Sequence, residues 1–179
     1  MKTQVMIDIE TLGTKPGSVI VALGAIRFDK YTTYQGFYQK IDAKSCVELG
    51  LKMDPDTVMW WLKQADEPRQ EITKPGIHLS EALIRFNDWI SSFPENEKET
   101  KVWGNGSDFD NVLLSSAYDA ADIKRPWSYS NNRCYRTIKN LYPEIPLDRS
   151  GTHHNAYDDA RDQALHLITI SESCPRILQ

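Results

Sequence analysis

The sequence predicts an α/β domain built on a mixed sheet, and three observations lead to this prediction. Residues 4–10 and 18–28 are β-rich and largely apolar, and the turn residues TLGTKPG between them are typical of a hairpin. Residues 79–93 carry apolar side chains at helical spacing, as an amphipathic helix does. A short apolar segment, residues 101–104, precedes further helical patterns. This order of strands and helices is typical of an α/β domain with a mixed sheet.

The other elements of the first half follow from local patterns. Residues 32–41 form a third, more polar strand. Asp54 and Pro55 suit the N-cap and the first position of a short helix, because Asp can accept a backbone hydrogen bond there and Pro has none to donate. The helix over residues 79–93 is expected to bury one stripe, formed by Leu79, Leu83, Phe86, Trp89, Ile90 and Phe93.

The second half of the chain alternates loops with buried elements. After the polar loop 94–100, the expected order is strand 101–104, helix 109–121, helix 132–142, loop 143–152 and helix 155–173.

Length and composition bound the class of protein. The 179 residues, 40% of them hydrophobic, suit one domain over residues 1–179, and no apolar run approaches the roughly 20 residues that cross a bilayer. Acids stand in the first ten residues, where a secretory signal has its apolar core, so we expect a cytoplasmic protein without membrane contact. Cys46, Cys134 and Cys174 are widely separated and lack the spacing of a zinc site or a disulfide framework.

The net charge of −4 bears on nucleic-acid binding. Proteins that coat nucleic acid by charge alone are usually basic, so this class is disfavoured. An enzyme that meets phosphate through metal ions is not excluded, because bound cations neutralise its carboxylates.

The first chemical motif is Asp8-Ile9-Glu10, at the end of the first strand. Residues two apart share a face of a strand, so both carboxylates should point the same way while Ile9 enters the core. Adjacent acids repel one another and are costly to bury unless a cation binds them. The alternative is an exposed strand end with solvated acids.

The second motif is NGSDFDNVLL, in which Asp110 opens a helix directly after a buried strand. That position lies at the carboxyl end of the strand, where open α/β sheets place their sites. Alternatively, Asp108 or Asp110 only caps the helix N-terminus.

The third motif, HHNAYDDA at residues 153–160, leaves three pairings open by spacing alone: His153 with Asp158, His154 with Asp159, and His154 with Asp158. Residues five apart lie roughly 140° around a helix, so a pair at that spacing converges only if the His precedes the helix. The closer pair needs a helical His154, as a zinc hydrolase using His153, His154 and Asp158 would prefer. Four acids and a His instead suit two Mg²⁺ or Mn²⁺ ions, which prefer oxygen ligands, with the His accepting a proton from water.

Taken in this order, the three motifs resemble those of the DnaQ-like, or DEDDh, 3′–5′ exonucleases. The likeness is strongest to the branch with exodeoxyribonuclease VIII, phage exonuclease A and a mycobacterial exoribonuclease, and rests on MIDIETLG, DTVMWWLKQ, VWGNGSDFDN and HNAYDDAR. It implies a ribonuclease H-like fold with a mixed five-stranded sheet flanked by helices. It also implies metal binding by Asp8, Glu10, Asp110 and Asp159, with His154 as general base. One departure is Cys134, where this branch often has an acid.

The resemblance implies a metal-dependent enzyme that releases nucleoside 5′-monophosphates from the 3′ end of single-stranded nucleic acid. DNA is favoured as the substrate, and RNA or a non-catalytic binding role are the alternatives. Substrate contacts are expected at Thr11, Leu12, Trp61, Asn105 and Phe109. Either Trp60 or Trp61 could stack on a base, because adjacent helical residues point about 100° apart. The oligomeric state is left open, a homodimer included.

Overall fold

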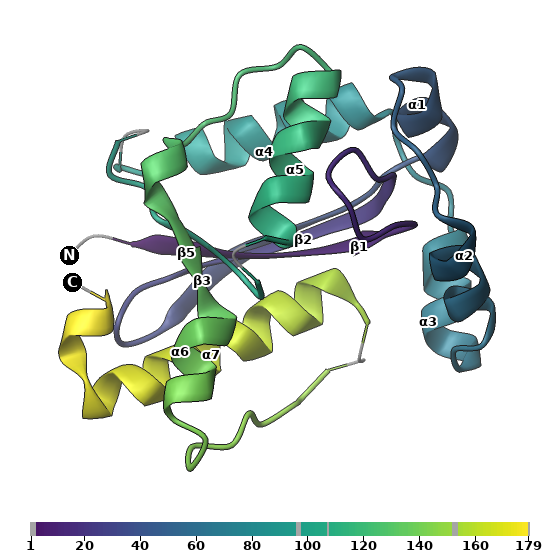
Figure 1. Cartoon of the computed structure of the whole chain (residues 1–179). Helices are drawn as coiled ribbons and strands as arrows, with labels where there is room; N and C mark the ends of the chain where they lie inside the picture. Colours follow the sequence, from purple (N-terminus) through teal and green to yellow (C-terminus); the bar gives the residue numbers. More distant parts are fainter. Residues whose placement is uncertain (1–2, 96–97, 107, 152–153, 179) are drawn as a thin grey trace.

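A five-stranded mixed sheet forms the centre of the protein, described here from a computed structural model (Figure 1). The structure describes residues 3–95, 98–106, 108–151 and 154–178. In spatial order the sheet is β3-β2-β1-β4-β5, in which β1 to β3 pair antiparallel while β4 runs parallel to both β1 and β5. The strands are β1 (Gln4–Thr11), β2 (Ile20–Phe28), β3 (Thr33–Lys40), β4 (Val102–Gly104) and β5 (Asn132–Cys134). The predicted mixed sheet and its N-terminal hairpin are therefore confirmed.

Helices cover both faces of this sheet (Figure 1). On one face, α4 (Leu79–Ser91) and α5 (Asp110–Ala120) pack over the larger hydrophobic core, to which β1 contributes Val5, Ile7 and Ile9. On the other face, α7 (Ala156–Ser173) and α6 (Tyr135–Leu141) pack over a smaller core that takes Met6 from β1. Alternation along β1 thus sends Asp8 and Glu10 to the side of α7, since they share a face with Met6.

The N-terminus of α7 lies directly against β2. A Cβ atom on Gly24 would stand 2.2 Å from the backbone of Ala156, so only glycine permits this approach. Gly24 is also the antiparallel partner of Asp8. This contact therefore brings the first turn of α7 beside the acids of β1.

The remaining helices differ from the sequence prediction in part. The predicted short helix appears as α2 (Pro55–Leu62) with Asp54 at its N-cap position, although the Asp54 side chain accepts from the Thr57 hydroxyl, not from the backbone. Two helices were not predicted, α1 (Ala43–Glu48) and α3 (Asp66–Thr73). The first is only six residues long and the second has no apolar stripe, so neither carries a clear helical period. Two short 3₁₀ turns complete the described chain, η1 (Tyr129–Asn131) and η2 (Pro175–Leu178).

The predicted helix over 132–142 was wrong at its start. Residues 132–134 form β5, which pairs with β4, and the helix begins only at Tyr135. The stripe predicted for α4 is confirmed, since four of its six members are buried and the other two pack against the same core. Trp103 is buried as well. Among the described residues, no helix is both long enough and apolar enough to span a membrane.

Candidate active site

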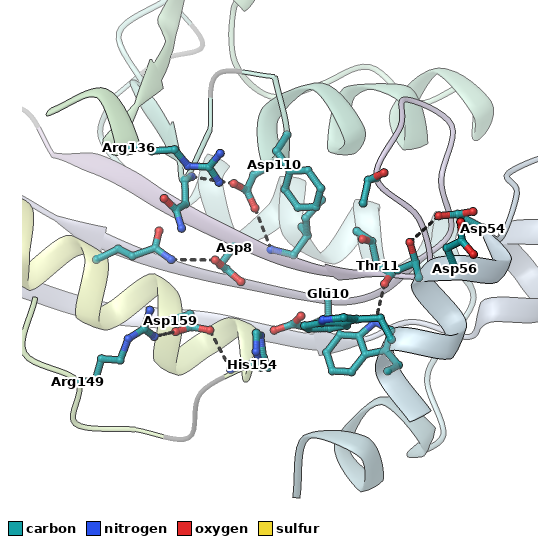
Figure 2. Close-up of a pocket in the computed structure, with 18 residues that line it drawn as sticks. Asp8, Glu10, Thr11, Asp54, Asp56, Asp110, Arg136, Arg149, His154 and Asp159 are labelled. Atoms are coloured by element: carbon teal, nitrogen blue, oxygen red, sulfur yellow. Dashed lines mark hydrogen bonds and ion pairs between the residues drawn. The ribbon is translucent and has the colours of Figure 1, made fainter. Parts of the chain in front are cut away.

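A cleft of about 610 Å³ opens where β1 and β4 end, beside the first turn of α7 (Figure 2). It collects side chains from β1, from α2, from the start of α5, and from α7 with the loop before it. The described residues that line it include Asp8, Glu10, Thr11, Trp60, Trp61, Asn105, Phe109, Asp110, Arg136, Arg149, His154, Asp159 and Gln163.

Asp8 and Glu10 both point into the cleft, as the two-residue period of a strand requires, while Ile9 lies in the core. Asp8 accepts a hydrogen bond of 2.8 Å from the side-chain amide of Gln163 on α7. Oε1 of Glu10 is buried and has no hydrogen-bond partner among the described residues. The alternative of solvated acids at an exposed strand end was therefore wrong.

Asp110 is fixed by backbone donors from two separate segments. Its Oδ2 accepts from the Asn105 amide at 2.7 Å, and its Oδ1 accepts from the Ile9 amide at 3.3 Å. The N-cap of α5 is Phe109, so neither Asp108 nor Asp110 occupies the cap position that the alternative required. Burial raises the pKa of Asp110 to about 6, although both amide hydrogen bonds act to lower it.

The third motif folds as a loop residue followed by a helix. Asn155 caps α7 by accepting from the amides of Tyr157 and Asp158 at 3.1 and 3.2 Å, so the helix begins after it. His154 precedes the cap with a positive φ of 63°, and its backbone amide donates to Oδ2 of Asp159 at 3.0 Å. Asp159 is buried in the first turn and faces the cleft.

This arrangement brings His154 together with Asp159, which is one of the three pairings that spacing left open. Asp158 pairs instead with Arg161 at 3.2 Å. His154 is not helical, so the geometry that the closer pair and the zinc alternative needed is absent from this part of the described chain. His153 lies outside the described residues.

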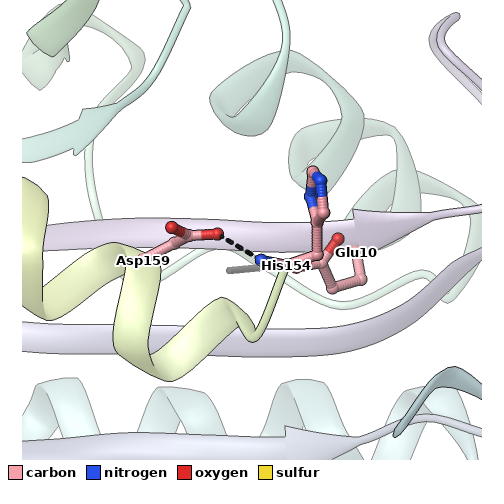
Figure 3. Close-up of side chains that lie close together, drawn as sticks. All are labelled: Glu10, His154 and Asp159. Carbon is pink, nitrogen blue, oxygen red and sulfur yellow. Dashed lines mark hydrogen bonds between the residues drawn. The ribbon is translucent and has the colours of Figure 1, made fainter. Parts of the chain in front are cut away.

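Glu10, His154 and Asp159 form a compact group of potential metal ligands (Figure 3). One ligand atom from each lies within 4.8 Å of the other two. The three residues come from β1, the loop before α7 and the first turn of α7, so the approach of α7 to Gly24 is what assembles them.

The four acids are close enough to perturb one another. Burial raises the pKa of Glu10 to about 8, and the charges of Asp159 and Asp110 add to this rise while Lys40 opposes it. Burial also holds the pKa of Asp8 well above its usual range, and the neighbouring charges of Asp110, Glu10 and Asp159 raise it further. Perturbed carboxyl groups that converge in a cleft are typical of a functional site.

Aromatic side chains form the wall of the cleft nearest α2. Trp61 is 3% exposed, and its indole N–H donates to the Thr11 carbonyl at 2.8 Å. Trp60 is 44% exposed, packs edge-on against Trp61, and has its ring centre 5.2 Å from that of His154. Trp61 is thus a buried support, whereas the ring of Trp60 is accessible.

The other predicted substrate-contact residues are not equivalent. Thr11, Asn105 and Phe109 line the cleft together with Trp61. Leu12 is half-buried and packs against the large core, and it is not among the described residues that line the cleft. A substrate contact by Leu12 stays a prediction that this geometry does not favour.

The cleft also contains residues that were not predicted as part of the site, among them Gln163, Arg136 and Arg149. Gln163 follows Asp159 by one helical turn on α7, a spacing that could have indicated it. Arg136 and Arg149 come from α6 and from the loop before α7, and Arg149 pairs directly with Asp159. No periodic signal marks an arginine in a loop.

Comparison with known proteins agrees with this geometry. The family model for the 3′-5′ exoribonuclease Rv2179c-like domain matches residues 3–171. An exodeoxyribonuclease of Enterobacteria phage T4 is 27% identical over 195 residues, covering 88% of this chain and 84% of the phage protein.

Solved structures show the same fold. The nuclease domain of 3′hExo, a DEDDh family member solved bound to rAMP, superposes with a TM-score of 0.64 at 14% identity and covers 96% of this chain and 92% of its own. E. coli exonuclease I, solved in complex with a dA16 oligonucleotide, gives a TM-score of 0.69 at 16% identity over 99% of this chain but 42% of its own. The ribonuclease H-like fold is thereby confirmed. The chain belongs to the 3′-5′ exoribonuclease Rv2179c-like family and is a 3′-5′ exonuclease, a hydrolase of phosphodiester bonds.

Proposed function

We propose that the protein removes nucleoside 5′-monophosphates from the 3′ end of a single strand, with two Mg²⁺ or Mn²⁺ ions held by Asp8, Glu10, Asp110 and Asp159. The observation that carries this proposal is the convergence of four carboxylates in one cleft, including the buried Oε1 of Glu10, for which the described part of the chain supplies no hydrogen-bond partner. A buried charged oxygen without a hydrogen-bond donor is unfavourable on its own, and a cation removes that cost. We also propose that residues 1–179 act as one exonuclease domain.

The donor set fits hard divalent cations. Carboxylate oxygens are the ligands that Mg²⁺ and Mn²⁺ prefer, and the group contains one imidazole and no thiolate. Two such ions supply charge stabilisation at the attacking and leaving oxygens of a phosphodiester.

The acids and His154 have separate proposed roles in metal binding and proton transfer. Asp8 lies between Glu10 and Asp110 with a fixed Gln163 contact, which suits a ligand shared by both ions. Glu10 and Asp159 suit the ion on the His154 side, and Asp110 suits the other. His154 lines the cleft from the loop before α7 and accepts the proton of the attacking water.

The accessible Trp60 is the better candidate to stack on a base of the strand. Trp61 is held by its hydrogen bond to Thr11 and supports Trp60 from behind. Stacking on an aromatic ring tolerates any base.

We favour DNA as the substrate, with RNA as the second candidate. The phage T4 relative is an exodeoxyribonuclease, whereas the matching family model is described as an exoribonuclease domain. The sugars differ only in the 2′-hydroxyl group, so one or two contacts decide between them.

The test is digestion of matched DNA and RNA strands, labelled at either end, with Mn²⁺ present. Release of the 3′-terminal nucleotide first, and faster from DNA, is the expected result. Attack from the 5′ end contradicts the proposal, and faster release from RNA reverses the choice of sugar. A control with Asp8→Asn identifies contaminating nucleases, because that variant should be inactive on every strand.

A further inference from the structure

Arg149 is a cation placed among the acids of the cleft (Figure 2). It comes from the loop between α6 and α7, and its Nη1 contacts Oδ1 of Asp159 directly. The other oxygen of Asp159, Oδ2, accepts from the backbone amide of His154 at 3.0 Å. Both oxygens of a proposed metal ligand are therefore already engaged by N–H donors of the protein.

A divalent ion that binds Asp159 competes with these donors for the oxygen lone pairs, and its charge repels the guanidinium of Arg149. The His154 donor is a backbone amide next to the helix cap Asn155, so it cannot leave without remodelling the start of α7. The Arg149 donor is the end of a long side chain that is 40% exposed. Arg149 is thus the donor that an incoming ion displaces.

The backbone beside Arg149 is anchored even though its side chain can move. The amide and hydroxyl of Ser150 donate to the carboxylate of Asp162 at 3.0 and 2.8 Å, and Arg161 donates to the Ser150 hydroxyl at 2.9 Å. Asp162 is buried on α7, which ties the loop to that helix. A displaced guanidinium therefore stays at the mouth of the cleft.

We propose that Arg149 is an exchangeable counter-ion, which neutralises Asp159 before metal binds and then binds a phosphate of the nucleic acid once the ion has taken its place. This inference rests on the proposed function, because it assigns a second state to the same site. A guanidinium suits both partners, since its fork of N–H donors matches a carboxylate and a phosphate alike. In the metal-free protein, Arg149 balances the negative charge of the acids. Once metal ions are bound, its guanidinium is released and its positive charge becomes available to the nucleic acid.

The test is calorimetric titration of the purified chain with Mn²⁺, and then of the Mn²⁺-loaded chain with deoxythymidine 5′-monophosphate. Four proteins are compared: wild type, Arg149→Ala, Arg149→Lys, and Arg85→Ala as a control that removes an exposed arginine from α4. Circular dichroism and thermal melting of each variant establish that it is folded.

In Arg149→Ala we expect Mn²⁺ to bind about three- to tenfold more tightly, because its competitor is gone. The nucleotide should then bind the loaded variant about tenfold more weakly, because its phosphate has lost a charged donor. Arg149→Lys keeps a cation but loses the fork of donors, so it should lie between wild type and Arg149→Ala in both titrations, whereas Arg85→Ala should match wild type. A residue that only supported the fold would weaken both affinities in both Arg149 variants.

Three results overturn the inference, in different ways. If Mn²⁺ binds wild type and folded Arg149→Ala tightly and with the same affinity, Arg149 is not exchanged for metal, and the proposed function still stands. The same conclusion follows if the nucleotide binds both Mn²⁺-loaded proteins equally well. Failure of Mn²⁺ to bind wild type at all contradicts the proposed function and the role of Arg149 together.

Discussion

Replacing Glu10 by glutamine is expected to flatten the pH dependence of stability in the metal-free protein. The pKa of Glu10 is raised from 4.5 to about 8, mainly by burial. The native state therefore keeps a proton that the unfolded chain has already lost above about pH 4.5. The contribution of Glu10 to stability is complete below that pH and is lost progressively as the pH rises through about 8.

The magnitude follows from the width of this window. One pH unit inside it changes the free energy of unfolding by about 1.4 kcal/mol, so a rise from about pH 5.5 to about pH 7.5 should cost about 3 kcal/mol. The Glu10→Gln variant lacks this titration, while Asp8 and Asp110 remain in both proteins. The buried side-chain amide of the glutamine changes the free energy of unfolding by the same amount at every pH. It therefore shifts the whole curve of this free energy against pH and does not change its slope.

Urea unfolding in EDTA at several pH values measures this directly. Wild type should lose about 3 kcal/mol more than Glu10→Gln between the two pH values. Glu81→Gln on α4 is the matched control, because it removes a glutamate whose side chain is exposed and paired only with Arg85. Its curve should follow wild type. Parallel curves for wild type and Glu10→Gln would refute the assignment of a raised pKa to Glu10.

Three further substitutions test other parts of the site. Asp8→Ala should abolish release of nucleotides from end-labelled strands. Its melting temperature in EDTA should stay the same or rise, because one of several carboxylates that repel one another is gone. Full activity of this variant would contradict the proposed role of Asp8. Lys40 is buried and its charge lowers the pKa of Glu10, so Lys40→Met should raise that pKa and extend the pH-dependent loss of stability to higher pH, as measured by urea unfolding in EDTA; an unchanged pH profile would show that its charge does not reach Glu10. Trp60→Ala should raise KM for a single-stranded oligonucleotide by about 5- to 100-fold, while Trp60→Phe keeps most of the affinity; equal KM values would exclude stacking there.

Much of the fold could be predicted because its main elements carry a period. The hairpin of β1 and β2 and the apolar stripe of α4 are local patterns that burial on one face imposes. The strand β5 could not be predicted in this way, because three residues are too few to show a period and their state depends on the neighbouring β4. The helix α3 was missed for a different reason, because its two apolar residues, Pro68 and Ile72, are too few to show an apolar stripe in the sequence.

Asp8, Glu10 and Asp110 could be predicted from their spacing and their places at the ends of strands and helices, whereas the choice of Asp159 over Asp158 came from the family resemblance. Spacing could not choose a partner for His154, because that choice depends on where α7 begins, and Asn155 sets this by capping the helix. The identity of the exposed tryptophan depends on the packing of α2 against β1, which no local pattern records. Arg149 reaches Asp159 only through the path of a loop, so it too is a tertiary feature.

The central claim is that the four carboxylates of the cleft hold two divalent ions in contact with a nucleotide phosphate. Crystals grown with Mn²⁺ and deoxythymidine 5′-monophosphate test it most directly through the anomalous signal of manganese. We expect two manganese peaks about 4 Å apart, within ligand distance of Asp8, Glu10, Asp110 and Asp159 and bridged by the phosphate. A fully occupied nucleotide with no manganese between these carboxylates would contradict the account.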